Sequence, residues 1–319
     1  MHPAYSVIVF TTASGAGYGL LFGLALFTLV GGLPEDLAFW LGGAGLAFAM
    51  VTFGLLASTV HLGHPERAWR ALSQWRSSWL SREGVAALLS YPVAGLFALD
   101  RLFAAPGGDL DGVALALALA TLVMCAATVA STAMIYVSLG TIRRWSNGWV
   151  LPGYLLLGLA TGLLWLNLLV VAFGGGHFAL SWLVVSALAA AGLVKIAYWF
   201  SIDRDTGGPT PESATGLGGL GTVRLLDAPH TSENYIQKEM GYVVARRHAD
   251  KLRHTAMLVG VAAPIVLTVA ALAFDATWGV VLCALLAAAA GSLGAVVERW
   301  LFFAEAKHSV MLYYGAPNA

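Results

Sequence analysis

The chain has 319 residues, of which 59% are hydrophobic and only 11% are charged. Soluble domains carry about a quarter charged residues, and the mean hydropathy here is +0.77. The composition therefore excludes an ordinary soluble enzyme and predicts an integral membrane protein with zero formal charge. We expect the lipid bilayer around it and no nucleic acid partner.

Eight apolar segments are each long enough to cross a bilayer as a helix, because a hydrocarbon core of ~30 Å needs about 20 helical residues. They cover residues 6–32, 38–60, 84–104, 113–139, 150–173, 178–200, 256–274 and 277–300. Small residues are dense inside them and let membrane helices approach closely. The sequence predicts an all-α, polytopic fold: a compact bundle of eight transmembrane helices in one integral membrane domain, residues 1–319. The first segment is expected to remain as a span, because Met1 to Ser6 lacks the basic residues of a signal peptide.

Positive charge is distributed unevenly between the two sides of the predicted bundle. Of the 17 Lys and Arg residues, Arg101 alone falls on the side opposite to both termini. By the positive-inside rule, both termini and the large polar connections are predicted to face the cytoplasm, in a multi-pass protein of the bacterial inner membrane.

The connection at 61–83 contains two His, two Glu, four Arg and three Trp residues. Pro65 and Glu66 suit the start of a helix. One apolar face then recurs at helical spacing, formed by Ala68, Leu72, Trp75 and Trp79. This pattern predicts an interfacial amphipathic helix with tryptophans at headgroup depth and arginines towards water or anionic lipid.

His61 and Glu83 bracket this connection, at the end of the second predicted span and the start of the third. An antiparallel helix pair would bring them together at one membrane depth. A histidine and a carboxylate at the mouth of such a cleft suit a quinone, whose ring needs a hydrogen-bond partner and a proton relay. Arg67, Trp79 and Arg82 are then expected to shape the pocket or to contact a partner.

Simpler interpretations of these two residues remain open. His61 would be an interfacial histidine, and Glu83 a first-turn acid of a helix with Ser81 as its N-cap.

The other ionisable groups and the thiols predict no further cofactor. No histidine lies at mid-membrane, where transmembrane haem ligands are expected, and the isolated Cys125 and Cys283 cannot supply the four thiolates of an iron–sulfur cluster or a zinc site. Glu298 and Arg299 predict a local ion pair or an arginine that snorkels outward, and Lys195 is close enough to a span end to snorkel. We expect no haem, no iron–sulfur cluster, no metal and no catalytic residue in this chain.

Residues 201–254 form the only extended segment outside the predicted spans. Its first part is rich in Gly, Pro and Thr and is predicted to be irregular, and its second part, 232–253, has a helix-like pattern. We expect this segment to dock soluble partners on the cytoplasmic side.

The sequence His61-Leu62-Gly63, followed by Glu83 within Leu80-Ser81-Arg82-Glu83, resembles the membrane-anchor subunit of dimethyl sulfoxide reductase. The eight spans and the position of this connection extend the resemblance over nearly the whole chain. It implies an anchor that binds a quinone (menaquinone or ubiquinone), assembled with a molybdopterin catalytic subunit and an iron–sulfur electron-transfer subunit. The family's quinol-site histidine and glutamate would fall on His61 and Glu83.

The segment 227–242 is also similar to the anchor of a cytoplasm-facing relative, a sulfite:quinone oxidoreductase. The docking residues expected within it are His230, Asn234, Tyr235, Lys238 and Glu239. This resemblance implies that electrons pass from sulfite through the partners to quinone. The alternatives are an anchor of a quinol-oxidising sulfoxide reductase and a passive membrane scaffold. An exporter is disfavoured, because broken helices with polar midplane residues are not evident.

Overall fold

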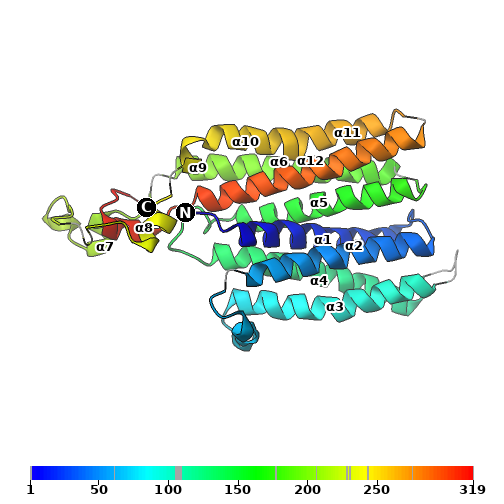
Figure 1. Ribbon diagram of the computed structural model, residues 1–319, viewed down its shortest axis with the longest axis horizontal. Coiled ribbons are helices and arrows are strands. Elements are labelled where there is room, and N and C mark those ends of the chain that lie inside the picture. The colour runs from blue at the N-terminus through cyan, green and yellow to red at the C-terminus, as the bar shows by residue number, and fades with distance from the viewer. Residues whose placement is uncertain are drawn as a thin grey trace.

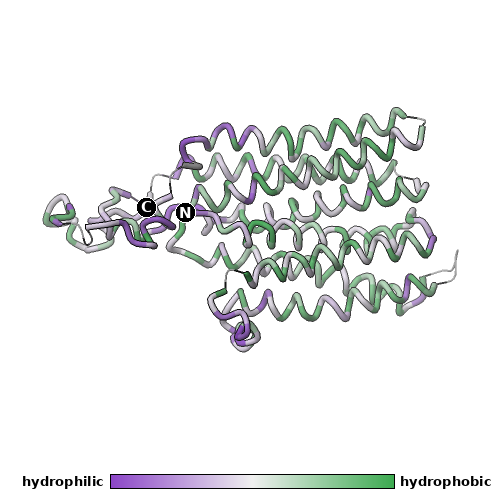
Figure 2. Tube along the Cα trace, viewed as in Figure 1, coloured by the Kyte–Doolittle hydropathy of each residue, from purple (hydrophilic) through white to green (hydrophobic). Residues whose placement is uncertain are grey.

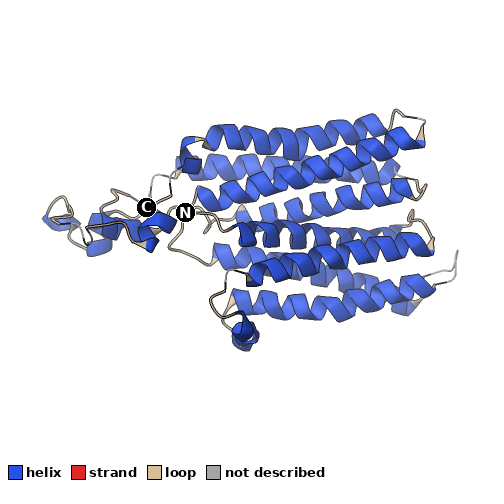
Figure 3. Ribbon diagram, viewed as in Figure 1, coloured by secondary structure: helices blue, strands red, loops and turns tan. Residues whose placement is uncertain are grey.

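The structure is a computed structural model that describes residues 2–60, 62–104, 110–176, 178–205, 207–227, 229, 231–242, 244–274 and 276–318. Within these residues it contains helices and loops and no strand (Figures 1 and 3). The elements are α1 (Tyr5–Val30), α2 (Leu37–Thr59), η1 (Pro65–Gln74), α3 (Trp79–Phe103), α4 (Gly112–Val137), α5 (Val150–Ala172), α6 (Phe178–Arg204), α7 (Pro211–Thr215), η2 (Gly218–Leu220), α8 (Tyr235–Met240), α9 (Val244–Arg247), α10 (Ala249–Met257), η3 (Leu258–Ala262), α11 (Ala263–Ala271), α12 (Thr277–Ala304) and η4 (Ser309–Tyr314).

Eight helical segments in the described part of the chain are long and apolar enough to cross a membrane, which confirms the predicted fold class. They are α1 to α6, the continuous segment Ala249–Ala271, and α12. The eight lie alongside one another in a single bundle, and both termini lie at the same end (Figure 1). Hydrophilic residues gather at that end, in an extension that includes α7 and α8 (Figure 2). We call it the polar end.

The centre of the bundle is the crossing of α1 with α5, and α1 has the largest buried share of the eight spans. Glycines make this crossing close. A Cβ atom added to Gly162 of α5 would lie 2.5 Å from the Cα atom of Gly19 in α1. Because hydrocarbon lipid provides no hydrophobic driving force between helices, such backbone-to-backbone packing stabilises the bundle.

A π-helical turn, η3, joins α10 to α11 within the seventh span. Pro264 follows it, and a proline has no backbone N–H to continue the α-helical ladder, so the wider turn accommodates the lost hydrogen bond. The turn also brings Gly260 against α12, where an added Cβ atom would lie 3.0 Å from the Gly294 Cα atom.

The predicted interfacial helix is present as a 3-10 helix, η1, whose turns are tighter than the α-helical spacing of its apolar residues. The apolar face is also divided, because Trp79 is the first residue of α3. Leu72 packs under the start of α3, where an added Cβ atom at Gly84 would lie 2.8 Å from its side chain. Trp69 and Trp75 are 67% and 52% exposed. The contact between Leu72 and the start of α3 holds η1 in the tighter 3-10 geometry.

The second part of the 201–254 segment is not one helix as its pattern suggests, but the short helices α8 and α9 followed by α10. Gly241 ends α8, and its N–H donates to the Gln237 carbonyl at 2.8 Å. The first part, predicted to be irregular, contains the last turn of α6 up to Arg204 and then only the short α7 and η2 among its described residues.

Candidate functional site

Glu83 is a buried carboxylate just inside the polar end of α3. The helix begins at Trp79, with Ser78 at the N-cap position, so the predicted N-cap at Ser81 was wrong and Glu83 lies beyond the first turn. Its side chain is 5% exposed. The Thr132 hydroxyl of α4 donates a hydrogen bond to its Oε1 atom. None of the salt bridges among the described residues includes Glu83.

Ser81 joins the loop to the helix that carries Glu83. Its hydroxyl donates to the Ala71 carbonyl of η1, and this bond adds to the contact between Leu72 and α3. The 3-10 segment therefore covers the start of α3, and Glu83 lies beneath it on the inner side of the helix.

Trp79 and Arg82 contact each other, and their interactions stabilise the loop before α3. The Arg82 guanidinium donates to the Trp75 carbonyl at 3.0 Å and the Arg76 carbonyl at 2.7 Å. It also lies 4.2 Å from the centre of the Trp79 ring. In the described residues no hydrogen bond or ion pair connects either side chain with Glu83. They hold the turn between η1 and α3 in place.

The other two predicted pocket residues are not placed beside Glu83. Arg67 is exposed on the loop, with its Nε atom 3.7 Å from Glu66. His61 falls outside the described residues, so its distance from Glu83 stays a prediction.

An apolar groove of about 230 Å³ runs between α1, α4 and α5. A smaller cavity of about 20 Å³, which Thr132 lines, lies beside it. Tyr18, Val129 and Gly158 belong to both linings. The Tyr18 hydroxyl lies 3.2 Å from Ser90 of α3. The groove thus shares part of its wall with the cavity that reaches Thr132, whose hydroxyl holds the Glu83 carboxylate.

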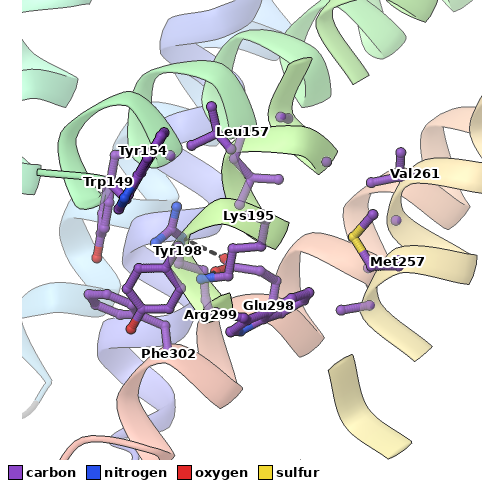
Figure 4. Close-up of a pocket in the computed structure, with 18 of the residues that line it drawn as sticks. Trp149, Tyr154, Leu157, Lys195, Tyr198, Met257, Val261, Glu298, Arg299 and Phe302 are labelled. Atoms are coloured by element: carbon purple, nitrogen blue, oxygen red, sulfur yellow. Dashed lines mark ion pairs between the residues drawn. The ribbon is translucent and has the colours of Figure 1, made fainter. Parts of the chain in front are cut away.

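A buried ionic cluster of Lys195, Glu298 and Arg299 is the most pronounced feature that the sequence predicted only in part (Figure 4). Lys195 of α6 pairs with Glu298 of α12, so it does not snorkel outward. The Arg299 Nε atom lies 3.3 Å from Glu298, and the guanidinium stacks 3.6 Å from the centre of the Tyr154 ring. Arg299 is 4% exposed. The local pair with Glu298 was therefore predicted correctly, whereas outward snorkelling of Arg299 was not.

Lys195 lies more than two helical turns before the end of α6 at Arg204. A charge so far within an apolar helix is costly unless it is paired. The position of Lys195 in the sequence could therefore have predicted an acidic partner inside the bundle. The identity of the partner required the packing of α6 on α12.

Near the polar end, a second ionic cluster joins α6, α10 and the residue after α12. The Arg253 guanidinium donates to Asp203 at 2.9 Å and to Glu305 at 2.6 Å. In the loop beside it, Arg143 donates to Asp205 at 2.7 Å. That hydrogen bond holds the pKa of the Asp205 carboxyl below its usual value.

Four of the five expected docking residues belong to α8 or to its N-cap, in the polar extension. Asn234 caps the helix in a capping box with Gln237, and its amide donates to the Tyr314 hydroxyl at 3.0 Å. Tyr235 is 71% exposed, and Lys238 and Glu239 are exposed as well. His230 falls outside the described residues.

No group of three or more His, Cys, Asp or Glu side chains in the described part of the chain could hold a metal ion.

A family model described as DMSO reductase anchor subunit (DmsC) matches residues 1–305. One of the sulfite dehydrogenase subunits of Allochromatium vinosum is 31% identical to this chain over 335 residues, covering 98% of this chain and 99% of that protein.

Proposed function

The chain belongs to the DMSO reductase anchor subunit family, and on that premise we propose that it is the quinone-reactive membrane anchor of a molybdopterin and iron–sulfur oxidoreductase. In this proposal, soluble partners oxidise sulfite at the polar end, and an iron–sulfur subunit passes the electrons to a quinone held beside α3.

The observation that carries the proposal is the Glu83 carboxylate. It is buried, it accepts a hydrogen bond from Thr132, and it has no salt-bridge partner among the described residues. Burying an unpaired carboxylate is costly, and such groups inside membrane helices mark proton relays. A quinone bound here supplies a two-electron, two-proton acceptor, and Glu83 delivers protons to it.

The surroundings of Glu83 fit such a ligand. Thr132 holds the carboxylate in one orientation, and the groove of about 230 Å³ offers an apolar surface for an isoprenoid tail. In the proposal His61 hydrogen-bonds the ring. Trp79 and Arg82 act indirectly, because they hold the turn that covers the site.

The direction of electron flow and the side of the membrane are also part of the proposal. The relative from Allochromatium vinosum is named for sulfite dehydrogenase, and the Lys and Arg residues gather at the polar end. We therefore infer that the polar end and both termini face the cytoplasm and that α8, with Asn234, Tyr235, Lys238 and Glu239, contacts the iron–sulfur subunit. The family description supports the alternative, a sulfoxide reductase anchor that oxidises quinol.

The test uses the assembled complex in its membrane with the variants Glu83→Gln and His61→Ala. General acid–base groups contribute about 10²–10⁴-fold to a rate. We expect sulfite-dependent reduction of a short-tailed quinone to fall by about 100-fold in each variant, and sulfite oxidation with ferricyanide to stay at the parental rate. The control is Glu66→Gln, which alters an exposed carboxylate in the same connection.

Parental quinone reduction in both variants would refute the site. If the complex bound no quinone at all, the passive scaffold would be the correct function. If it consumed quinol with a sulfoxide acceptor and failed to oxidise sulfite, the reductase alternative would hold.

A further inference from the structure

The ionic cluster of Lys195, Glu298 and Arg299 has no role in the function proposed above. It lies within the bundle, with Glu298 6% and Arg299 4% exposed. Lys195 and Arg299 set two cations against Glu298, and in the neighbouring cluster Asp203 and Glu305 set two anions against Arg253. Charged groups this deep in a membrane bundle are costly and mark functional sites. Among the described residues, Glu83 is a buried carboxylate that no salt bridge pairs with a cation.

Two small cavities lie between the cluster and Thr132, the residue that donates a hydrogen bond to Glu83. The first, of about 40 Å³, is lined by Lys195 and Glu298 and extends to Trp149 at the polar end of α5 (Figure 4). The second is the cavity of about 20 Å³ that Thr132 lines. Tyr154 and Arg299 belong to both linings. A cavity of about 10–15 Å³ is enough for one water molecule when polar groups surround it, so each cavity has room for water.

Tyr154 lies at the junction of the two cavities. Its side chain is 4% exposed, and in the described residues its hydroxyl has no hydrogen-bond partner. A buried hydroxyl without a partner is costly, whereas water in either cavity would satisfy it. The stacked Arg299 guanidinium, 3.6 Å from the ring centre, holds the ring in place.

We propose that a proton-transfer route runs from Lys195 through Tyr154 and Thr132 to the Glu83 carboxyl, and this proposal rests on the proposed function. Reduction of a quinone to a quinol consumes two electrons, which the iron–sulfur subunit supplies, and two protons. Each proton that leaves the Glu83 carboxyl is replaced by the proton of the Thr132 hydroxyl, and as that O–H bond breaks a new one forms on the same oxygen with a proton from cavity water. The Tyr154 hydroxyl passes protons to that water in the same way.

Lys195 is the group that donates protons into the route. Lysine can release its proton inside a protein, whereas arginine cannot, so Arg299 serves as a fixed charge. An N–H bond of Lys195 breaks as an O–H bond forms on cavity water, and the amine is reprotonated from the entrance at Trp149. The route therefore takes its protons from the polar end, the side that also carries the termini.

The test compares two variants in the assembled complex, with sulfite as electron donor and a short-tailed quinone as acceptor. Tyr154→Phe removes one hydroxyl. Lys195→Met removes the amine and leaves Glu298 with Arg299, 3.3 Å away, as its partner, so neither remaining buried charge is stranded. The control is Asp100→Asn, which breaks an ion pair outside the route, where Asp100 lies 2.7 Å from Arg101.

We expect both route variants to lose about tenfold or more of quinone-linked turnover, with the KM for quinone within about twofold of the parent. Ferricyanide-linked sulfite oxidation should not change. The solvent deuterium isotope effect should increase, and imidazole in the buffer should restore part of the turnover, since a mobile proton carrier replaces a missing relay.

Parental turnover in both variants, with loss in Glu83→Gln, would overturn the route and leave the proposed function intact. Lower turnover with an unchanged isotope effect and no rescue by imidazole would show a structural role and also overturn it. If Glu83→Gln itself kept the parental rate of quinone reduction, the role of Glu83 in the proposed function would be refuted, and the route that ends at Glu83 with it.

Discussion

Gly162 offers a direct test of how the bundle packs, because it lies where α5 crosses α1. A Cβ atom added to Gly162 would lie 2.5 Å from the Gly19 Cα atom, whereas nonbonded carbon atoms prefer about 3.5–4.0 Å. The Gly19 carbonyl carbon and the Leu20 nitrogen would lie closer still, so Gly162→Ala requires the two helices to separate by more than about 1 Å. The obstacle is backbone, so no change of rotamer can relieve it.

The expected cost follows from this separation. Overpacking costs about 1–3 kcal/mol, and a gap of up to about 1 Å forfeits a quarter to a half of each affected contact energy. We take the upper end, about 3 kcal/mol, because α1 is the most buried of the spans. Alanine gains about 1 kcal/mol of helix propensity over glycine, so the free energy of unfolding should fall by about 2 kcal/mol.

The assay is reversible unfolding in mixed micelles of a mild detergent and dodecyl sulfate, followed by loss of helical circular dichroism. The control is Gly45→Ala in α2, where an added Cβ atom has nothing within 4 Å. This control should be as stable as the parent or more so. If Gly162→Ala unfolded at the same dodecyl sulfate fraction as Gly45→Ala, the account of a backbone-limited crossing would be refuted.

Two further predictions concern the polar end. Arg82→Lys removes the planar fork that holds the loop carbonyls, so we expect faster amide exchange at Ser77 and Ser78, with Arg70→Lys as the control. The Arg143 guanidinium holds the pKa of the Asp205 carboxyl below its usual value. The ion pair therefore stabilises the fold fully at pH values above the ordinary carboxyl pKa of about 4. This stabilisation is lost as the pH falls through the lower pKa that Asp205 has in the folded state. Exchange protection factors across residues 140–149 should fall in that window, and in Asp205→Asn they should not depend on it.

The spans could be predicted from sequence because the requirement is local. Inside a bilayer the backbone must satisfy its own hydrogen bonds, so every long apolar segment has to be a helix. Departures came where tertiary contacts compete with the local pattern. In the 61–83 connection, Ser81 and Leu72 attach the loop to α3, and helical periodicity alone could not show the 3-10 geometry that results.

Only part of the candidate site could be predicted from the sequence. Glu83 could be selected because a carboxylate at a span end is conspicuous, but its partner Thr132 lies 49 residues away and looks like any small residue of a packed helix. The position of Tyr154 between the two cavities could not be predicted either, because in the sequence it is one aromatic residue within an apolar span.

By itself, the sequence determined that this protein is a bundle of eight membrane helices with its charges gathered at one end, because hydropathy and charge act residue by residue. Only the tertiary structure decided that Lys195 meets Glu298 and that two cavities connect them with Thr132. The reason is physical: the rotation of each helix about its axis is set by close packing against its neighbours, and that rotation decides which polar side chains share the interior.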